Sequence, residues 1–152
     1  VPEDMDLLFA WSNEPEVRGN SFSTSLISYE EHEAWFEKIL SVRDIRQYIY
    51  MCGDEAVGQV RVAVSGDLAE ISYSVCAERR HMGHGKKMLR ILKQQVKRDF
   101  PQVNRLTAKV KPNNIVSRKA FLSAGYEERY EVYELDIATE TQKEAENKLC
   151  CT

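Results

Sequence analysis

Cysteine is scarce in this chain, with four among 152 residues, and no two of them show Cys-x-x-Cys spacing. Two of the four are neighbours, Cys150 and Cys151, which cannot build a disulfide framework for a chain of this size. We therefore expect reduced cysteines in a reducing compartment, the cytoplasm.

Excess positive charge is also missing, because the formal net charge is −3 and the sequence pI is about 5.7. Nucleic-acid partners are therefore not expected, since phosphate backbones are bound by clustered Lys and Arg. Apolar runs are too short to cross a bilayer and no signal peptide opens the chain, so no membrane partner is expected either. The three histidines are scattered without nearby cysteines, which predicts no metal site.

Two glycines one residue apart, Gly83 and Gly85, follow a β-rich run, Glu70–Val75, and precede an amphipathic run, Lys86–Phe100. This order predicts a strand, a phosphate-binding loop and a helix, because glycines let several N–H groups converge on an anion. ATP or GTP hydrolysis is not expected, since Arg80 and Lys87 occupy positions where a P-loop requires Gly and Ser or Thr. A dinucleotide fingerprint fails as well, because Met88 replaces its third glycine.

A second pair of elements follows. Residues 105–111 alternate, with apolar side chains on one face, and predict a strand parallel to the one before the loop. Pro112 to Asn114 then open a short helix that Gly125 closes, with Val116, Ala120 and Ala124 on one face.

These two linked motifs, Arg-x-x-Gly-x-Gly and Asn-x-x-Ser, resemble the second half of the GNAT N-acetyltransferases. The strings at residues 11–22 and 27–36 resemble the subgroup that acetylates UDP-linked amino deoxy sugars in pseudaminic acid biosynthesis, with ribosomal-protein and polyamine acetyltransferases as cousins. The resemblance implies an α/β fold with a mixed, mostly antiparallel sheet, splayed between its fourth and fifth strands, and helices on both faces.

The resemblance covers residues 1–136, followed by a polar, helix-prone tail at 137–152. Because the chain opens where GNAT domains have finished their first strand, that strand is expected to be truncated. Either that strand is absent from the sequence, or the chain is a piece of a longer protein in which the acetyltransferase follows another enzyme of the same pathway, and the sequence leaves both open.

Ahead of the loop, Asp4 is expected to cap a helix reaching Trp11, and Pro15 to start a short turn or helix. Residues 18–27 are expected to form a loop. Ser28 and Glu31 make a capping box for a helix ending near Ser41. Strands at 47–52, 56–64 and 68–75 should form an antiparallel meander, and residues 126–135 a final strand.

The resemblance implies coenzyme A or acetyl-CoA as the cofactor. Its pyrophosphate would lie on the loop, its pantetheine arm would pair with the third strand, and the second helix would flank that arm. A bulge near Val75 or Cys76 would free an N–H for the thioester oxygen. The expected cofactor-binding residues are Tyr73, Ser74, Val75, Cys76, Arg80, His81, Met82, Gly83, His84, Gly85, Lys86, Asn114, Ser117 and Phe121.

For proton removal from the amine, the resemblance points to Glu70 acting through water, with His32 and Glu30 as more remote alternatives. The family's usual acid is a tyrosine seven residues after the motif Asn, where this chain has Phe121. The proton for the departing sulfur would then come from Ser117, Tyr73 or Tyr126, or the sulfur would leave unassisted.

The acceptor favoured by the resemblance is a small-molecule amine, the amino group of a nucleotide-linked sugar. Arg18, Asn20, Phe22 and Arg61 are the residues expected to contact it, by phosphate binding and stacking. A protein N-terminal or polyamine acetyltransferase stays open, as does an acyl-CoA-binding module without turnover. A homodimer also stays open.

Overall fold

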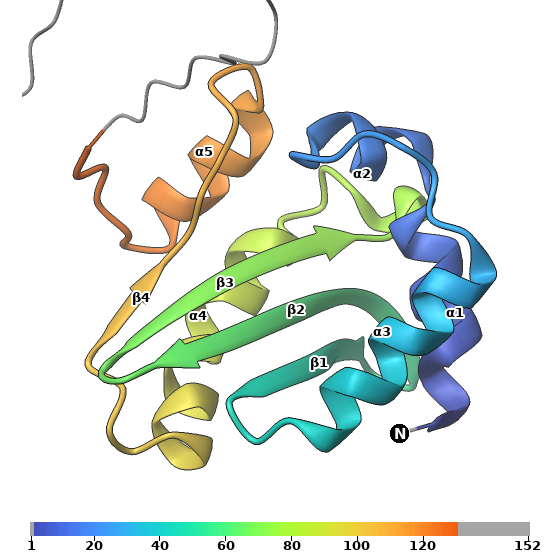
Figure 1. Cartoon of the computed structure of the whole chain (residues 1–152). Coiled ribbons are helices and arrows are strands. Elements are labelled where there is room, and N and C mark those ends of the chain that lie inside the picture. Colours follow the sequence, from blue (N-terminus) through green and yellow to red (C-terminus); the bar gives the residue numbers. More distant parts are fainter. Residues whose placement is uncertain (1, 131–152) are drawn as a thin grey trace, which may run out of the picture.

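The centre of the fold is a four-stranded sheet in the order β1-β2-β3-β4, shown in Figure 1 by a computed structural model that describes residues 2–130. The strands are β1 (Ile45–Cys52), β2 (Glu55–Ser65), β3 (Leu68–Val75) and β4 (Arg105–Thr107). The helices are α1 (Met5–Ser12), α2 (Pro15–Asn20), α3 (Tyr29–Ser41), α4 (His84–Asp99) and α5 (Ile115–Ser123), with short 3-10 turns η1 (Pro2–Asp4) and η2 (Ala77–Arg79).

The first three strands form the antiparallel meander that the sequence predicts. Tight turns join them at Gly53 and Gly66, whose φ angles of 63° and 62° lie in the region that glycine adopts without steric cost. Turn chemistry and apolar runs therefore fix the order and direction of these strands.

The strand β4 runs parallel to β3, as expected for a crossover through α4. Its pairing begins at Leu68 with Arg105 and ends at Glu70 with Thr107, so the predicted extension to Lys111 is wrong. Beyond Glu70, β3 pairs only with β2 among the residues described. The alternating pattern at 105–111 reflects side chains that pack on the core without strand pairing, and the splay of the sheet stays a prediction.

Helices cover both faces of the sheet (Figure 1). One core joins α4, through Met88, Leu92 and Val96, to Val60 and Val62 of β2. A smaller core lies on the other face, where Leu8 of α1 and Phe36 and Ile39 of α3 pack against β1. Along β1 the side chains alternate between these two cores, as the two-residue period of a strand requires.

The helices α2 and α3 begin at residues whose side chains cap the first turn. The capping box of α3 is present, with the Ser28 side chain accepting from the Glu31 N–H and the Glu31 carboxylate accepting from the Ser28 N–H. In α2, Pro15 stands at the first position and Glu14 is the N-cap. Because that cap and proline carry the helix to Asn20, the predicted loop at 18–27 starts too early.

The helix α5 begins after Asn114, whose side chain accepts from the Ser117 N–H at 3.1 Å, and Gly125 follows its end with a φ of 92°. One part of its predicted apolar face is wrong, because Val116 is 57% exposed. Phe121, at 8% exposure, is the buried anchor instead, because it continues the i, i+3/i+4 pattern from Ser117 through Ala120 to Ala124.

The predicted last strand is not seen in the part that is described, since residues 126–130 have no regular secondary structure. Its remainder and the predicted helical tail at 137–152 lie outside the described residues. Among residues 2–130, no helix is both long and apolar enough to cross a membrane, and no cluster of metal-ligating side chains is present.

Candidate active site

The loop after β3 has the backbone of an anion cradle. His81 and Gly83 both lie in the left-handed region, with φ angles of 61° and 80°, and Gly83 is the N-cap of α4. Because helical hydrogen bonds start only with the Lys87 N–H, which donates to the Gly83 carbonyl at 3.2 Å, the N–H groups of the first turn have no helical acceptor. Donor groups and the positive end of a 16-residue helix therefore meet at this loop.

Two local observations fit a bound diphosphate. A Cβ added at Gly83 would meet nothing within 4 Å, so the space in front of the loop is open to a ligand. The side chain of His84 is 7% exposed, and its Nδ1 atom is buried without a partner among the described residues. The donor set and the open space fit the pyrophosphate of coenzyme A.

The basic residues around the loop make different contacts. Arg79 pairs with Glu55, and the Arg90 side chain donates to the Ser123 carbonyl at 3.2 Å. The guanidinium of Arg80 contacts three groups at once, the Val75 carbonyl and the carboxylates of Glu14 and Glu16. Arg80 is therefore engaged in joining α2 to this loop, and its contact with the cofactor stays a prediction.

Lys86 and Lys87, by contrast, have no ion pair among residues 2–130. Met82 stands at the surface of the loop with 56% of its area exposed. Phosphate charge at this site would therefore be met by main-chain N–H groups and by these lysines.

The bulge predicted at the end of β3 is not found, because β2 and β3 stay in one register from Leu68 to Val75. The irregularity lies between β1 and β2 instead, at Tyr50 and Met51. The Cys76 N–H is also occupied, since it donates to the Val57 carbonyl at 2.9 Å.

The alternation of an antiparallel ladder then decides which donors of β3 are open. Residues that face each other exchange hydrogen bonds at every second pair. Because the Cys76 N–H bonds to β2, the N–H groups of Val75 and Tyr73 point away from β2. They point toward the edge of β3 that does not pair with β4. They are the main-chain donors available at this edge.

Four side chains meet where β3 faces α5. The Ser117 hydroxyl donates to the Tyr73 hydroxyl at 3.0 Å, and the Phe121 ring lies edge-on to both Tyr73 and Tyr126, with centroids 5.4 and 5.1 Å apart. Burial raises the pKa of Tyr73, although the hydrogen bond from Ser117 acts in the opposite direction. Burial also raises the pKa of Tyr126 to about 12, and its hydroxyl has no partner among the described residues.

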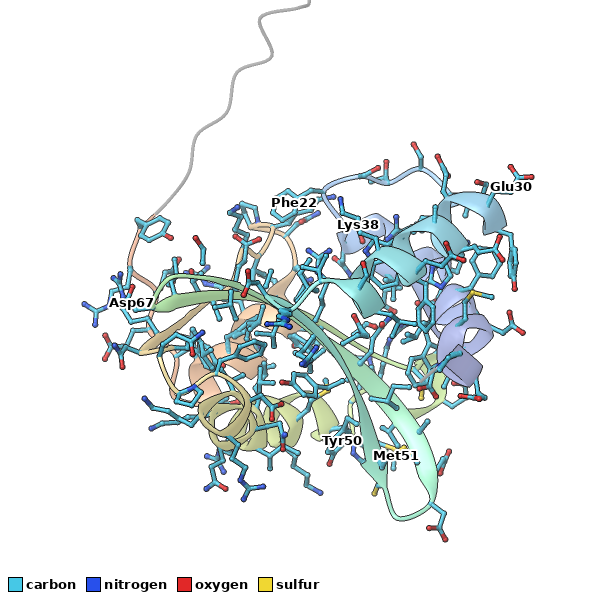
Figure 2. All side chains as sticks on the ribbon, turned by 60° about the horizontal axis from the view of Figure 1, so that its bottom comes forward. Phe22, Glu30, Lys38, Tyr50, Met51 and Asp67 are labelled. Carbon is cyan, nitrogen blue, oxygen red and sulfur yellow. The ribbon has the colours of Figure 1, made fainter. Side chains whose placement is uncertain are left out.

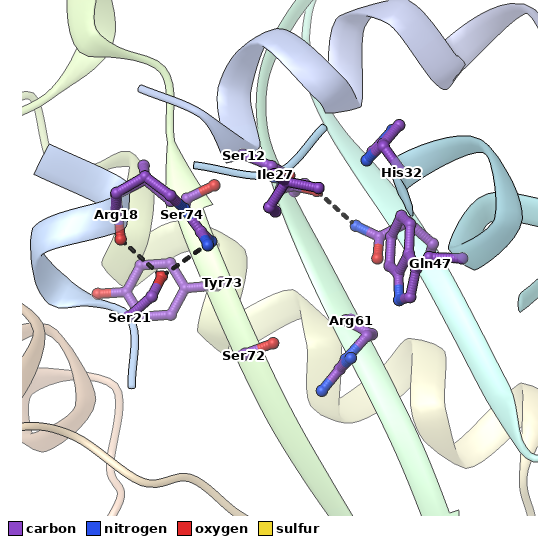
Figure 3. A pocket seen from close by; sticks show the side chains of 13 residues that line it. Ser12, Arg18, Ser21, Ile27, His32, Gln47, Arg61, Ser72, Tyr73 and Ser74 are labelled. Carbon is purple, nitrogen blue, oxygen red and sulfur yellow. Dashed lines mark hydrogen bonds between the residues drawn. The ribbon is translucent and has the colours of Figure 1, made fainter. Parts of the chain in front are cut away.

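A pocket of about 300 Å³ opens on the sheet face opposite α4 (Figure 3). Its floor is made of residues of β1, β2 and β3 and its roof of α2 and the segment that follows it, and residues of α1 and α3 complete the lining. Its lining residues are Ser12, Val17, Arg18, Ser21, Ile27, His32, Trp35, Gln47, Gln59, Arg61, Ser72, Tyr73 and Ser74. Two guanidinium groups and no carboxylate are among them.

Hydrogen bonds from Asn13 and Arg18 hold the segment 21–27 in place. The Asn13 side chain makes two hydrogen bonds of 2.8 Å with the backbone of Ile27, one donated and one accepted. Arg18 donates to the carbonyls of Ser23 and Ser25 and to the Ser21 hydroxyl. These bonds shape the roof of the pocket.

The four residues predicted to contact an acceptor are therefore divided. Arg18 and Arg61 line the pocket, and Asn20 and Phe22 do not. Phe22 follows the pocket residue Ser21 directly, and its side chain stands at the surface with 65% of its area exposed (Figure 2). Arg61 lies on the face opposite Val60 and Val62, where the pocket is.

The predicted base Glu70 is outside the pocket lining. It is on the same face of β3 as Ser72 and Ser74, and its carboxylate pairs with the Lys109 ammonium at 2.9 Å. The alternative His32 lines the pocket, but it is 2% exposed and its Nε2 atom is 3.1 Å from the Met5 carbonyl. Burial lowers the pKa of His32, so the ring is neutral near pH 7. Glu30 is an exposed residue of α3.

Sequence reasoning missed the neutral polar floor of the pocket, Gln47, Gln59, Ser72 and Ser74. A signal was present, because these residues alternate with apolar ones along three strands and so share one face of the sheet. Trp35 packs in part against the smaller core and also lines the pocket.

Residues 1–127 match the acetyltransferase (GNAT) domain family. The chain therefore belongs to the GNAT family of N-acetyltransferases, and the resemblance of its motifs is confirmed at this level. A comparison with curated protein sequences gave no match.

Solved structures share the fold. The aminoglycoside acetyltransferase AAC(6')-Ib, in complex with ribostamycin and coenzyme A, has a TM-score of 0.73 at 20% identity, over 84% of this chain and 79% of that one. The ribosomal-protein-alanine N-acetyltransferase from Brucella melitensis has a TM-score of 0.69 at 21% identity, over 86% and 83%. At this identity the likeness supports the fold and leaves the acceptor open.

Proposed function

We propose that the protein transfers the acetyl group of acetyl-CoA to a primary amine on a small anionic acceptor, such as an amino sugar linked to a nucleotide. The observation that carries the proposal is the charge of the pocket, whose lining holds Arg18 and Arg61 but no carboxylate. A polycationic amine would bring like charges together there, whereas a phosphate group would be attracted.

The coenzyme part of the proposal is supported by the loop and by the relatives. Main-chain donors of His81 to Lys86, open space at Gly83 and the start of α4 fit a diphosphate. Relatives with this fold have been solved with coenzyme A and with acetyl-CoA. When bound, acetyl-CoA supplies an acetyl group activated as a thioester.

Within the pocket, Arg61 is the better phosphate ligand. The terminal nitrogens of Arg18 already donate to the roof segment, while no ion pair or hydrogen bond engages Arg61 among the residues described. A guanidinium in this situation can bind a phosphate with two parallel hydrogen bonds.

The remaining lining suits a sugar. Ser72, Ser74, Gln47 and Gln59 offer neutral donors and acceptors for hydroxyl groups, and the Trp35 ring offers an apolar surface. A volume of about 300 Å³ is at the low end for small-ligand pockets, so the nucleotide would extend outward. The exposed Phe22 ring beside the roof could then stack with a base.

For proton removal we keep Glu70 as the proposed base, acting through water. Its carboxylate shares the pocket face of β3 and lies two residues from the pocket residue Ser72. His32 is the competing base, since it is neutral and in the lining. For the developing oxyanion we propose the Val75 N–H, which is free of the ladder to β2.

The proposal is tested by thiol release from acetyl-CoA with a panel of amines. The panel holds UDP-linked amino sugars, the aminoglycosides ribostamycin and kanamycin, a polyamine and a basic N-terminal peptide. Turnover with the anionic amines and little with the cationic ones supports the proposal. Preference for an aminoglycoside, a polyamine or a peptide would overturn the acceptor assignment, and coenzyme binding without turnover on any amine would favour a binding module.

A further inference from the structure

The departing sulfur needs a proton, and three hydroxyl groups surround the apolar ring of Phe121. They belong to Tyr73 of β3, Ser117 of α5 and Tyr126 after α5. Phe121 itself has no proton to give. The geometry of the three hydroxyls decides between them.

Tyr73 lies next to three parts of the site, which are the acceptor pocket, the start of α4 and α5. Its position on β3 borders the acceptor pocket, and its side chain lies on the α4 face of the sheet, opposite Ser72 and Ser74. A Cβ added at Gly85, in the first turn of α4, would lie 3.2 Å from the Tyr73 ring and 3.4 Å from its hydroxyl oxygen, so the ring rests directly against the phosphate loop's helix. Its hydroxyl also touches Ser117 of α5.

The Ser117 and Tyr73 hydroxyl oxygens lie 3.0 Å apart, and either hydroxyl can donate to the other. When Ser117 donates, the Tyr73 oxygen receives a hydrogen bond and its own proton is left for a third atom. A phenol in this arrangement can donate its proton to a third atom, and the anion left behind keeps a hydrogen bond from Ser117.

The other two hydroxyls are less suited. The proton of Ser117 is already directed at Tyr73. The hydroxyl of Tyr126 is buried without a partner and is not part of the pocket lining. Its ring packs edge-on against the Phe121 ring.

We propose that Tyr73 is the general acid of the transfer and that Ser117 is its positioning residue. The inference rests on the proposed function. The amine nitrogen bonds to the thioester carbon, the carbon–sulfur bond breaks, and its electron pair passes to sulfur, which takes the Tyr73 proton. The proton lost by the amine reaches the tyrosinate through the base and water, so the enzyme returns to its starting state.

The test uses coenzyme A itself and needs no acceptor. The full chain is saturated with coenzyme A, and the thiol is titrated by the ultraviolet absorbance of its thiolate. A hydrogen bond from Tyr73 stabilises the thiolate, so Tyr73→Phe should raise the pKa of the bound thiol by about one to two. Ser117→Ala should raise it by less, and Ser117→Thr, which keeps the hydroxyl, should restore it.

Two tyrosines serve for comparison. Tyr130→Phe removes a hydroxyl at a side chain that is 72% exposed and should leave the thiol unchanged. Tyr126→Phe removes the buried hydroxyl of the other tyrosine that packs on Phe121 and should also leave the thiol unchanged. With an accepted amine in hand, Tyr73→Phe should lower turnover about 100-fold, the usual contribution of a general acid.

The outcomes separate the two proposals. A thiol pKa that is the same in Tyr73→Phe and wild type, with coenzyme A bound to both, would overturn the role of Tyr73. A rise in Tyr126→Phe alone would assign the acid to Tyr126 and also overturn it. Failure of the wild type to bind coenzyme A would instead contradict the proposed function.

Discussion

Arg80 and Glu14 form an ion pair that joins the coenzyme loop to the roof of the acceptor pocket. The guanidinium also donates to the Val75 carbonyl, and the carboxylate also caps α2. Both side chains are largely buried, with exposures of 16% and 26%. An ion pair between residues 66 positions apart in the chain therefore joins the two halves of the proposed site.

Removing the charge of Glu14 should destabilise the fold. We expect Glu14→Gln to lower the free energy of unfolding by about 1–2 kcal/mol, between the values for surface and buried pairs, and the Tm by about 3–6 °C. Glu16→Gln is the matched control, because Glu16 pairs with the same guanidinium but is 53% exposed. Thermal unfolding of both variants measures the difference, and equal effects would contradict the assigned role of Glu14.

The same pair predicts a pH dependence. The hydrogen bond from Arg80 lowers the pKa of Glu14 below its ordinary value in the folded state. Its contribution is therefore complete above the unfolded pKa of about 4.3 and is lost as the pH falls through the lower folded value. Urea unfolding at several pH values should show the gap between wild type and Glu14→Gln closing below about pH 4. A gap that stays constant down to pH 2 would exclude this linkage.

Gly83 should be required for coenzyme binding. Because its φ is 80°, an alanine is strained there by about 1–2 kcal/mol, and the Cβ enters the space in front of the loop. Loss of one charge-assisted hydrogen bond predicts about 10–100-fold weaker binding of acetyl-CoA by calorimetry. Gly66→Ala carries a similar strain in a distant turn, with a φ of 62°, and should destabilise without weakening binding. Equal affinity of the two variants would refute the loop assignment.

Arg61 should decide which acceptors are used. We expect Arg61→Gln to lower kcat/KM for an anionic amine about 10–100-fold, as for a lost guanidinium–phosphate contact, and to leave the Kd of acetyl-CoA unchanged. Arg98→Gln removes an equal charge from the exposed side of α4 and is the control. If both variants lower kcat/KM equally, only the overall charge matters and the pocket is not the acceptor site.

Glu70 is tested by the pH dependence of turnover. We expect Glu70→Gln to lower kcat/KM by about 100-fold. The loss should be largest at low pH, because most of the amine is then protonated and its deprotonation relies most on a base. Lys109→Met frees the carboxylate from its ion pair but keeps it, and should retain activity. A pH profile of Glu70→Gln that matches the wild type would transfer the role to His32, whose His32→Gln variant then becomes the informative one.

Local patterns predicted much of this fold. The box at Ser28 and Glu31, the antiparallel meander and the strand before the loop were all confirmed, because each depends on residues close in sequence. The crossover from β3 to β4 was also confirmed, since handedness leaves little choice.

The features that the sequence did not predict depend on contacts between residues distant in the chain. The sequence did not predict that Arg80 pairs with Glu16 and Glu14, which lie 64 and 66 positions earlier. The bulge in β3 was inferred from the resemblance alone, and the register with β2 is continuous. No local pattern reveals that Ser117 and Tyr73, 44 residues apart, share a hydrogen bond.

The central claim is that main-chain donors between His81 and Lys86, together with the open edge of β3, hold the coenzyme. Amide chemical shifts of the isotope-labelled chain, recorded while acetyl-CoA is added, test it most directly. We predict that the largest changes fall on residues 81–86 and on Tyr73 and Val75, with small changes at Gly53 and Gly66. Saturable changes confined to other parts of the chain would contradict the account.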